Sequence, residues 1–143
     1  MAWKILPGLI NSILLLGISA IHFYWALGGK WGIEKTLPTN LEGKKMLNPK
    51  KIDSALVAIF LLCFAILFLI KVELLPLHLP QLISRFGIGV ISAIFLLRAF
   101  GDLRYIGFTK KITSTDFARR DTQFYSPLCL LIGINGMLTE LFF

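Results

Sequence analysis

Four long apolar segments, separated by polar connections of unequal length, dominate the chain. They cover residues 5–27, 54–70, 80–100 and 122–143. A helix needs roughly 20 mainly apolar residues to cross the ~30 Å hydrocarbon core of a bilayer. Leu, Ile and Phe occur on all sides of each expected helix, which is typical of helices that face lipid. The pattern predicts an all-α fold: an integral membrane bundle of four transmembrane helices forming one domain, residues 1–143.

Residue types near the ends of these segments favour particular helix boundaries. Asp53 is suited to cap the second helix, and Lys71 is suited to end it with its ammonium group at the interface. Pro80 suits the first turn of the third helix. Pro127 lies inside the fourth segment, where it either opens the helix proper, with residues 115–126 as an interfacial segment, or kinks a longer helix. We favour the first interpretation.

Composition agrees with a membrane location. The chain is 56% hydrophobic and 16% charged, and its mean hydropathy is +0.76. A soluble fold of 143 residues with this composition would expose more apolar surface than water tolerates. Cys63 and Cys129 lie in apolar segments outside any metal-ligand or disulfide pattern, and we expect them to be buried. Residues 1–20 resemble a signal peptide but lack a small-residue cleavage site, so we assign them to the first helix.

Lysine and arginine are distributed unequally between the two ends of the expected helices. Twelve of the 15 lie near the connections at 28–53 and 101–121, and Lys4, Lys71 and Arg85 lie at the other end. Cytoplasmic loops are enriched in these residues, so we expect both long loops to be cytoplasmic and both termini to be outside. The net charge of +7 then reflects orientation in the lipid bilayer and attraction to anionic lipid headgroups, not nucleic-acid binding.

Two polar, aromatic-rich segments lie at the expected cytoplasmic ends of the helices. The first is HFYWALGGKWG (22–32), and the second, at 101–129, contains GDLRYIGF and FARRDTQFYSPLC. Tyr and Trp are enriched at membrane interfaces, so an aromatic and basic interfacial belt is the simplest explanation of both segments. A binding or catalytic site formed where they meet is the alternative.

An interfacial belt explains some residues of these segments poorly. An ionisable group inside a bilayer costs at least ~2.5–3.5 kcal/mol at a helix centre, so each such group requires a physical reason. The catalytic candidates are His22, as an acid or base near neutral pH, and Asp102 or Asp121, either of which would orient it. The candidate ligand-binding residues are Tyr24, Trp25, Arg98, Arg104, Arg119, Arg120 and Tyr125.

The strings HFYWALGGKWG, GDLRYIGF and DTQFYSPLCLLIG, together with four crossings, resemble a family of small bacterial four-helix integral membrane proteins, a domain of unknown function. The resemblance covers nearly the whole chain. It implies a helical bundle, multi-pass, in the bacterial inner (cytoplasmic) membrane. It supplies no catalytic residues, because no settled activity accompanies the family.

These residues leave three classes of function. We favour a protein that binds an anionic amphiphile or small metabolite in a pocket on the cytoplasmic side, formed by the two polar segments. The first alternative is a membrane-embedded enzyme acting on a lipid or isoprenoid-like substrate, with His22 as acid or base. The second is a small transporter or channel, which would be a homo-oligomer because four short helices enclose little space. Nucleotide, dinucleotide and metalloprotease motifs are absent from the sequence, and we expect no metal or cofactor.

Overall fold

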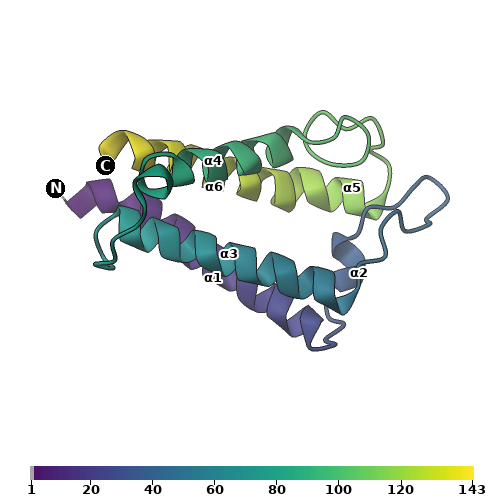
Figure 1. Ribbon diagram of the computed structural model, residues 1–143. Coiled ribbons are helices and arrows are strands. Elements are labelled where there is room, and N and C mark those ends of the chain that lie inside the picture. Colours follow the sequence, from purple (N-terminus) through teal and green to yellow (C-terminus); the bar gives the residue numbers. More distant parts are fainter. Residues whose placement is uncertain (1) are drawn as a thin grey trace.

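The computed structural model describes residues 2–143 and is built from helices (Figure 1). The elements in chain order are the 3-10 turn η1 (Ala2–Ile5), α1 (Leu6–Ala26), α2 (Ile33–Thr36), α3 (Lys51–Lys71), α4 (Gln81–Phe100), α5 (Asp116–Arg120), the π-helical turn η2 (Asp121–Tyr125) and α6 (Ser126–Phe142). Four helical stretches are long and apolar enough to cross a membrane, and they contain α1, α3, α4 and α6. This confirms the prediction of an all-α protein with four membrane-spanning helices.

The spanning helices form two antiparallel pairs, α1 with α3 and α4 with α6 (Figure 1). Helix α1 also contacts α6, whereas α3 contacts α4 much less than it contacts α1. Helices α2 and α5 lie together at one end of the bundle, which we call the loop end. The two ends of the chain and the 72–80 connection lie at the opposite end, which we call the terminal end. Both polar segments of the sequence are therefore at the loop end.

Small polar side chains on α1 connect the helices inside the bundle. Ser12 and Ser19 each donate a hydrogen bond to a backbone carbonyl of α3, at 3.0 and 2.7 Å. Asn11 Nδ2 donates to the carbonyl oxygen of Ile132 on α6 at 2.8 Å. Helix association in lipid gains little from the hydrophobic effect, so close packing and hydrogen bonds of this kind contribute much of the driving force.

The starts of α3 and α4 differ from the expected boundaries. Lys50, not Asp53, precedes α3. Asp53 lies in the first turn, where its Oδ2 accepts a hydrogen bond from the backbone N–H of Lys50 at 2.7 Å. Pro80 precedes α4 instead of occupying its first turn. Asp53 thus satisfies an N-terminal backbone donor from inside the helix, as the acidic partner of a capping box does.

Pro127 does not divide the fourth segment. The α-helix proper begins at Ser126 with Pro127 in its first turn, as the favoured interpretation expects. Residues 116–125 are not a separate segment, because helical structure is continuous from α5 through η2 into α6. The N–H of Ser126 donates to the carbonyl oxygen of Asp121, five residues earlier. Proline has no N–H, and its ring crowds the carbonyl group four residues before it. The π turn provides the extra space, and the helix continues past the proline.

The common core lies where the two helix pairs meet. It contains the buried side chains of Leu15, Phe68, Ile91 and Ile132. Cys63, which we expected to be buried, is exposed on α3, and Cys129 is half-buried. Large hydrophobic side chains are exposed along all four spanning helices, as expected for surfaces that contact lipid.

We predict that Gly133→Ala lowers the free energy of unfolding in detergent by about 1–3 kcal/mol, because overpacking separates two closely packed helices. A Cβ at Gly133 of α6 would lie 2.6 Å from Leu96 Cγ and 3.2 Å from the backbone nitrogen of Leu96 on α4. Gly17→Ala is the matched control, because nothing lies within 4 Å of a Cβ at that position. Equal effects of the two substitutions in denaturant unfolding followed by circular dichroism would contradict the close α4–α6 packing.

Candidate functional site

A buried carboxylate, that of Asp121, lies at the loop end where α4, η2 and the connection between α4 and α5 meet. Its side chain has no exposed surface. Oδ1 accepts a hydrogen bond from Arg98 Nη2 at 2.9 Å. Oδ2 accepts from Lys110 Nζ at 3.0 Å, from the N–H of Gly107 at 2.7 Å and from Ser126 Oγ at 3.1 Å. We call these five residues the Asp121 network; two cations face one carboxylate, so it carries an excess positive charge.

Lys110 is nearly as deeply buried as the carboxylate it pairs with, its side chain being 2% exposed. Besides Asp121, its Nζ donates to the carbonyl oxygen of Gly107 at 2.8 Å and to Thr122 Oγ1 at 2.6 Å. An ammonium group has three hydrogens to donate, and Asp121, Gly107 and Thr122 supply three acceptors. Burial of this charge is tolerated because it is paired and fully hydrogen-bonded.

Two glycines fold the α4–α5 connection back onto the end of α4. Gly101 and Gly107 have φ of +94° and +87°. A Cβ on Gly101 would overlap the backbone of Ile106, and a Cβ on Gly107 would overlap the backbone of Phe100. The N–H of Phe108 donates to the carbonyl oxygen of Ala99 at 2.9 Å, which closes the loop. Residues with a Cβ rarely adopt such a conformation, so glycine is required at both positions. This fold brings Gly107 and Lys110 to the carboxylate.

Asp102, a catalytic candidate from the sequence, has a structural role in the same loop. Its Oδ1 accepts hydrogen bonds from the N–H groups of Arg104 at 2.9 Å, Tyr105 at 2.7 Å and Ile106 at 2.9 Å. Partial desolvation acts to raise the pKa of Asp102, but these three backbone donors outweigh it and hold the pKa below its usual value. Asp102 is therefore an ionised turn-former on the exposed side of the loop.

His22 is half-buried near the end of α1 and its ring contacts its own helix. Nδ1 lies 2.9 Å from the carbonyl oxygen of Ile18, and because a carbonyl only accepts, Nδ1 carries the proton. The ring packs edge-on against Trp25, with centroids 4.8 Å apart. No hydrogen bond joins His22 to Asp102 or Asp121 within residues 2–143. The structure does not bring the three catalytic candidates together.

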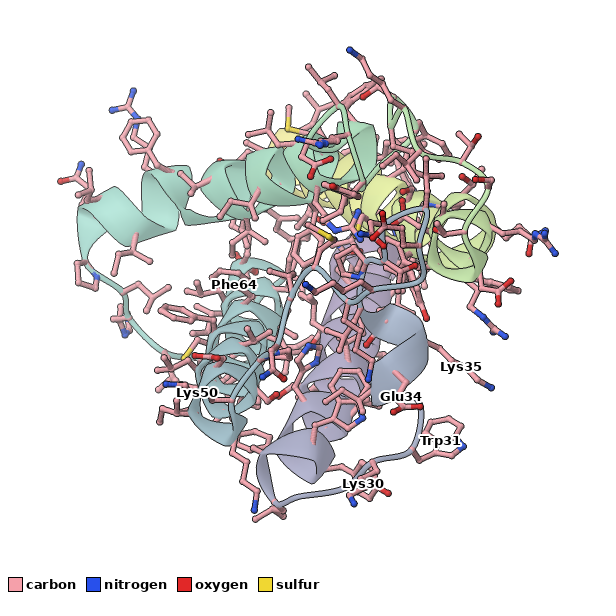
Figure 2. The ribbon with its side chains drawn as sticks, turned by 90° about the vertical axis from the view of Figure 1, so that its right-hand side faces the viewer. Lys30, Trp31, Glu34, Lys35, Lys50 and Phe64 are labelled. Carbon is pink, nitrogen blue, oxygen red and sulfur yellow. The ribbon has the colours of Figure 1, made fainter. Side chains whose placement is uncertain are left out.

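The first polar segment forms a tight turn held by its aromatic residues. Trp25 Nε1 donates to the carbonyl oxygen of Trp31 at 2.8 Å. The ring of Tyr24 lies against Gly29, where a Cβ would overlap the ring. Tyr24 and Trp31 are both exposed, and Figure 2, which looks onto the loop end, shows Trp31 pointing away from the bundle. These contacts match an interfacial aromatic turn better than the wall of an enclosed pocket.

Tyr125 joins the second polar segment to α2, the helix that follows the first polar segment. Its hydroxyl group lies 3.4 Å from the carbonyl oxygen of Lys35 in α2, and its ring lies against Phe117 with centroids 6.2 Å apart. The Lys35 side chain points outward at this end (Figure 2). The second polar segment therefore contacts α2, the helix that follows the first polar segment, and this contact does not involve His22.

The remaining arginine candidates lie on the surface of the loop end. Arg104, Arg119 and Arg120 are exposed, and none forms an ion pair within residues 2–143. The arginine that pairs internally is Arg98. Sequence reasoning did not identify Lys110 at all, because Lys110 and Lys111 look alike in the sequence and only the folded loop buries one and exposes the other.

No group of three or more histidine, cysteine or acidic residues is arranged to hold a metal ion in the part of the chain that the structure describes. Two cavities lie at the terminal end of the bundle. The loop end thus presents a basic surface built over the Asp121 network.

Residues 15–135 match a family described as "Protein of unknown function (DUF3995)". The match covers both polar segments and every residue of the Asp121 network. No curated protein and no solved structure matches the chain. The sequence resemblance to a family of unknown function is therefore confirmed.

We predict that Lys110→Met lowers the free energy of unfolding by about 3 kcal/mol, because it leaves part of a buried carboxylate uncompensated. Lys111→Met is the control: it removes the same charge from the exposed neighbouring position and is expected to change the stability by less than about 0.5 kcal/mol. Unfolding in detergent measures both. Equal destabilisation by the two substitutions would show that Lys110 is not held in the network.

Proposed function

The chain belongs to the family of unknown function DUF3995. From its own residues, we propose that it binds an anionic amphiphile at the loop end. One observation carries the proposal. Arg98 uses Nη2 to bind Asp121, while its Nη1 is buried without a hydrogen-bond partner in residues 2–143. A buried donor without an acceptor costs ~1–3 kcal/mol, and more when it is charged.

An anionic headgroup supplies the missing acceptor. The Arg98 side chain is 32% exposed, so a small movement of the guanidinium group brings Nη1 to an anion arriving from the surface. Guanidinium groups bind phosphate and carboxylate oxygens through paired, charge-assisted hydrogen bonds. The excess positive charge of the Asp121 network favours the same ligand class.

Exposed basic and apolar groups lie on the connection that follows α4, the helix that carries Arg98. The N–H of Ile112 donates to the carbonyl oxygen of Arg104 at 3.1 Å, which holds Arg104 beside the loop's second lysine, Lys111. Leu103, 62% exposed, and Phe108 present apolar surface on the same loop. Basic residues next to apolar ones suit a ligand with a charged head and a hydrocarbon tail.

The charge distribution supports a cytoplasmic location for the loop end in a bacterial inner membrane. Twelve of the 15 lysine and arginine residues lie there, and cytoplasmic loops carry this excess. The cytoplasmic leaflet is rich in anionic lipid, which attracts each nearby lysine or arginine by about 1 kcal/mol. Orientation and ligand class thus follow from the same charges.

No specific observation favours the two alternatives. The carbonyl oxygen of Ile18 orients the His22 ring, but in residues 2–143 no acidic side chain is hydrogen-bonded to it. A transporter would need polar groups along a path through the bundle, and the buried polar side chains Asn11, Ser12 and Ser19 are bonded between helices. Lipid binding remains the function that the geometry supports best.

We predict that Arg104→Gln weakens binding of a short-chain phosphatidylglycerol by about fivefold, the ratio expected for one lost cation near a headgroup. Native mass spectrometry of the detergent-purified protein measures the affinity. Lys4→Gln removes the same charge from the terminal end and should leave the affinity unchanged. Equal loss in both variants, or equal affinity of the parent protein for phosphatidylcholine, would contradict a site at the loop end.

A further inference from the structure

Two adjoining cavities lie at the terminal end, between α3, α4, α6 and the 72–80 connection. Their volumes are about 300 and about 500 Å³, within the range of roughly 300–1,000 Å³ found for small-molecule sites. Both are lined by Lys71, Leu79, Ser84 and Phe143. Loop-end binding makes no use of this region.

A partly buried ion pair lies in the wall of the larger cavity. Lys71 Nζ of α3 is 3.4 Å from Glu140 Oε1 of α6, with the two side chains 15% and 30% exposed. Lys71 Nζ is also 3.4 Å from the carbonyl oxygen of Ser84. Glu140 Oε2 is buried and has no hydrogen-bond donor in residues 2–143. A carboxylate accepts several hydrogen bonds, so Glu140 has unused capacity for a donor in the cavity.

A second cation lies at the same cavity, on the first turns of α4. Gln81, Ser84 and Arg85 all line it, since residues three and four apart lie on one face of a helix. Arg85 is exposed and forms no ion pair within residues 2–143. The side chains of Arg85, whose guanidinium lies 5.3 Å from the centroid of the Phe86 ring, and of Glu140 therefore line one cavity. Together they match a ligand that carries both an anionic group and an N–H-bearing cation.

The smaller cavity adds an apolar wall. It is lined by Leu67 and Ile70 of α3 and by Ile83 and Ile88 of α4, all on membrane-spanning helices. Because α3 contacts α4 only weakly, this wall lies along the seam between the two helix pairs. A small soluble zwitterion has no apolar group to pack against this wall, whereas the acyl chains of a lipid can pack against it.

We infer that these cavities bind the headgroup of a phospholipid of the phosphatidylethanolamine class. The ammonium group donates to Glu140 Oε2, the phosphate accepts from Arg85, and the acyl chains follow the apolar wall between α3 and α4. The site lies at the end of the bundle opposite Arg98 and Arg104, so it holds or fails independently of loop-end binding.

Titration of the full chain in detergent with short-chain lipids, followed by native mass spectrometry, tests the inference. Phosphatidylethanolamine should bind about tenfold more tightly than phosphatidylcholine with the same chains, because the quaternary ammonium of choline cannot donate to Glu140 and one charge-assisted hydrogen bond supplies about this ratio. Equal affinity for the two lipids would overturn it. Displacement of the lipid by free phosphoethanolamine at equal concentration would overturn the role of the apolar wall.

Two variants separate the headgroup contacts. Glu140→Gln should abolish the preference for phosphatidylethanolamine over phosphatidylcholine. Arg85→Gln changes an exposed side chain, so folding is preserved, and it should weaken both lipids about fivefold by removing one phosphate contact. Glu42→Gln, an exposed acid at the loop end, is the control and should change neither affinity. A preference that survives Glu140→Gln, or affinities unchanged by Arg85→Gln, would contradict the proposed contacts.

Discussion

The bonding of one buried carboxylate, that of Asp121, determines the structure of the loop end. Arg98 comes from α4, Lys110 and Gly107 from the connection, and Ser126 from the start of α6. In a medium of low dielectric constant neither cation nor carboxylate is tolerated alone, so all must be in place together. The network therefore joins the end of α4, the folded-back loop and the start of α6.

The two ends of the bundle have different electrostatic character. The loop end carries most of the positive charge and has a guanidinium nitrogen, Arg98 Nη1, without an acceptor among residues 2–143. The terminal end has an ion pair, Lys71–Glu140, with a carboxylate oxygen that lacks a donor within the same described residues. In a bilayer, each end of the bundle lies near headgroups. The unsatisfied groups therefore point to an anionic headgroup at one end and a zwitterionic one at the other.

The length and apolarity of four segments were enough to predict the four spanning helices, because a bilayer imposes both requirements on any crossing helix. The sequence also identified Arg98 and Asp121 as ionisable residues that an interfacial belt does not explain. It did not identify the pairing of Asp121 with Lys110, because that contact depends on two positive-φ glycines in the loop. Within residues 2–143 His22 is hydrogen-bonded to neither Asp102 nor Asp121, and both aspartates bind donors close to them. The continuous helix past Pro127 required a π turn that helical periodicity does not reveal.

The most direct test of the central claim is a double-mutant cycle between Lys110→Met and Asp121→Asn, measured as the free energy of unfolding in detergent. If the two side chains form one buried network, the effects are not additive. We predict a coupling free energy of about 1–3 kcal/mol, with the double variant less destabilised than the two single variants together. Additive effects within about 0.5 kcal/mol would contradict the account, because they would show that Lys110 and Asp121 stabilise the fold independently.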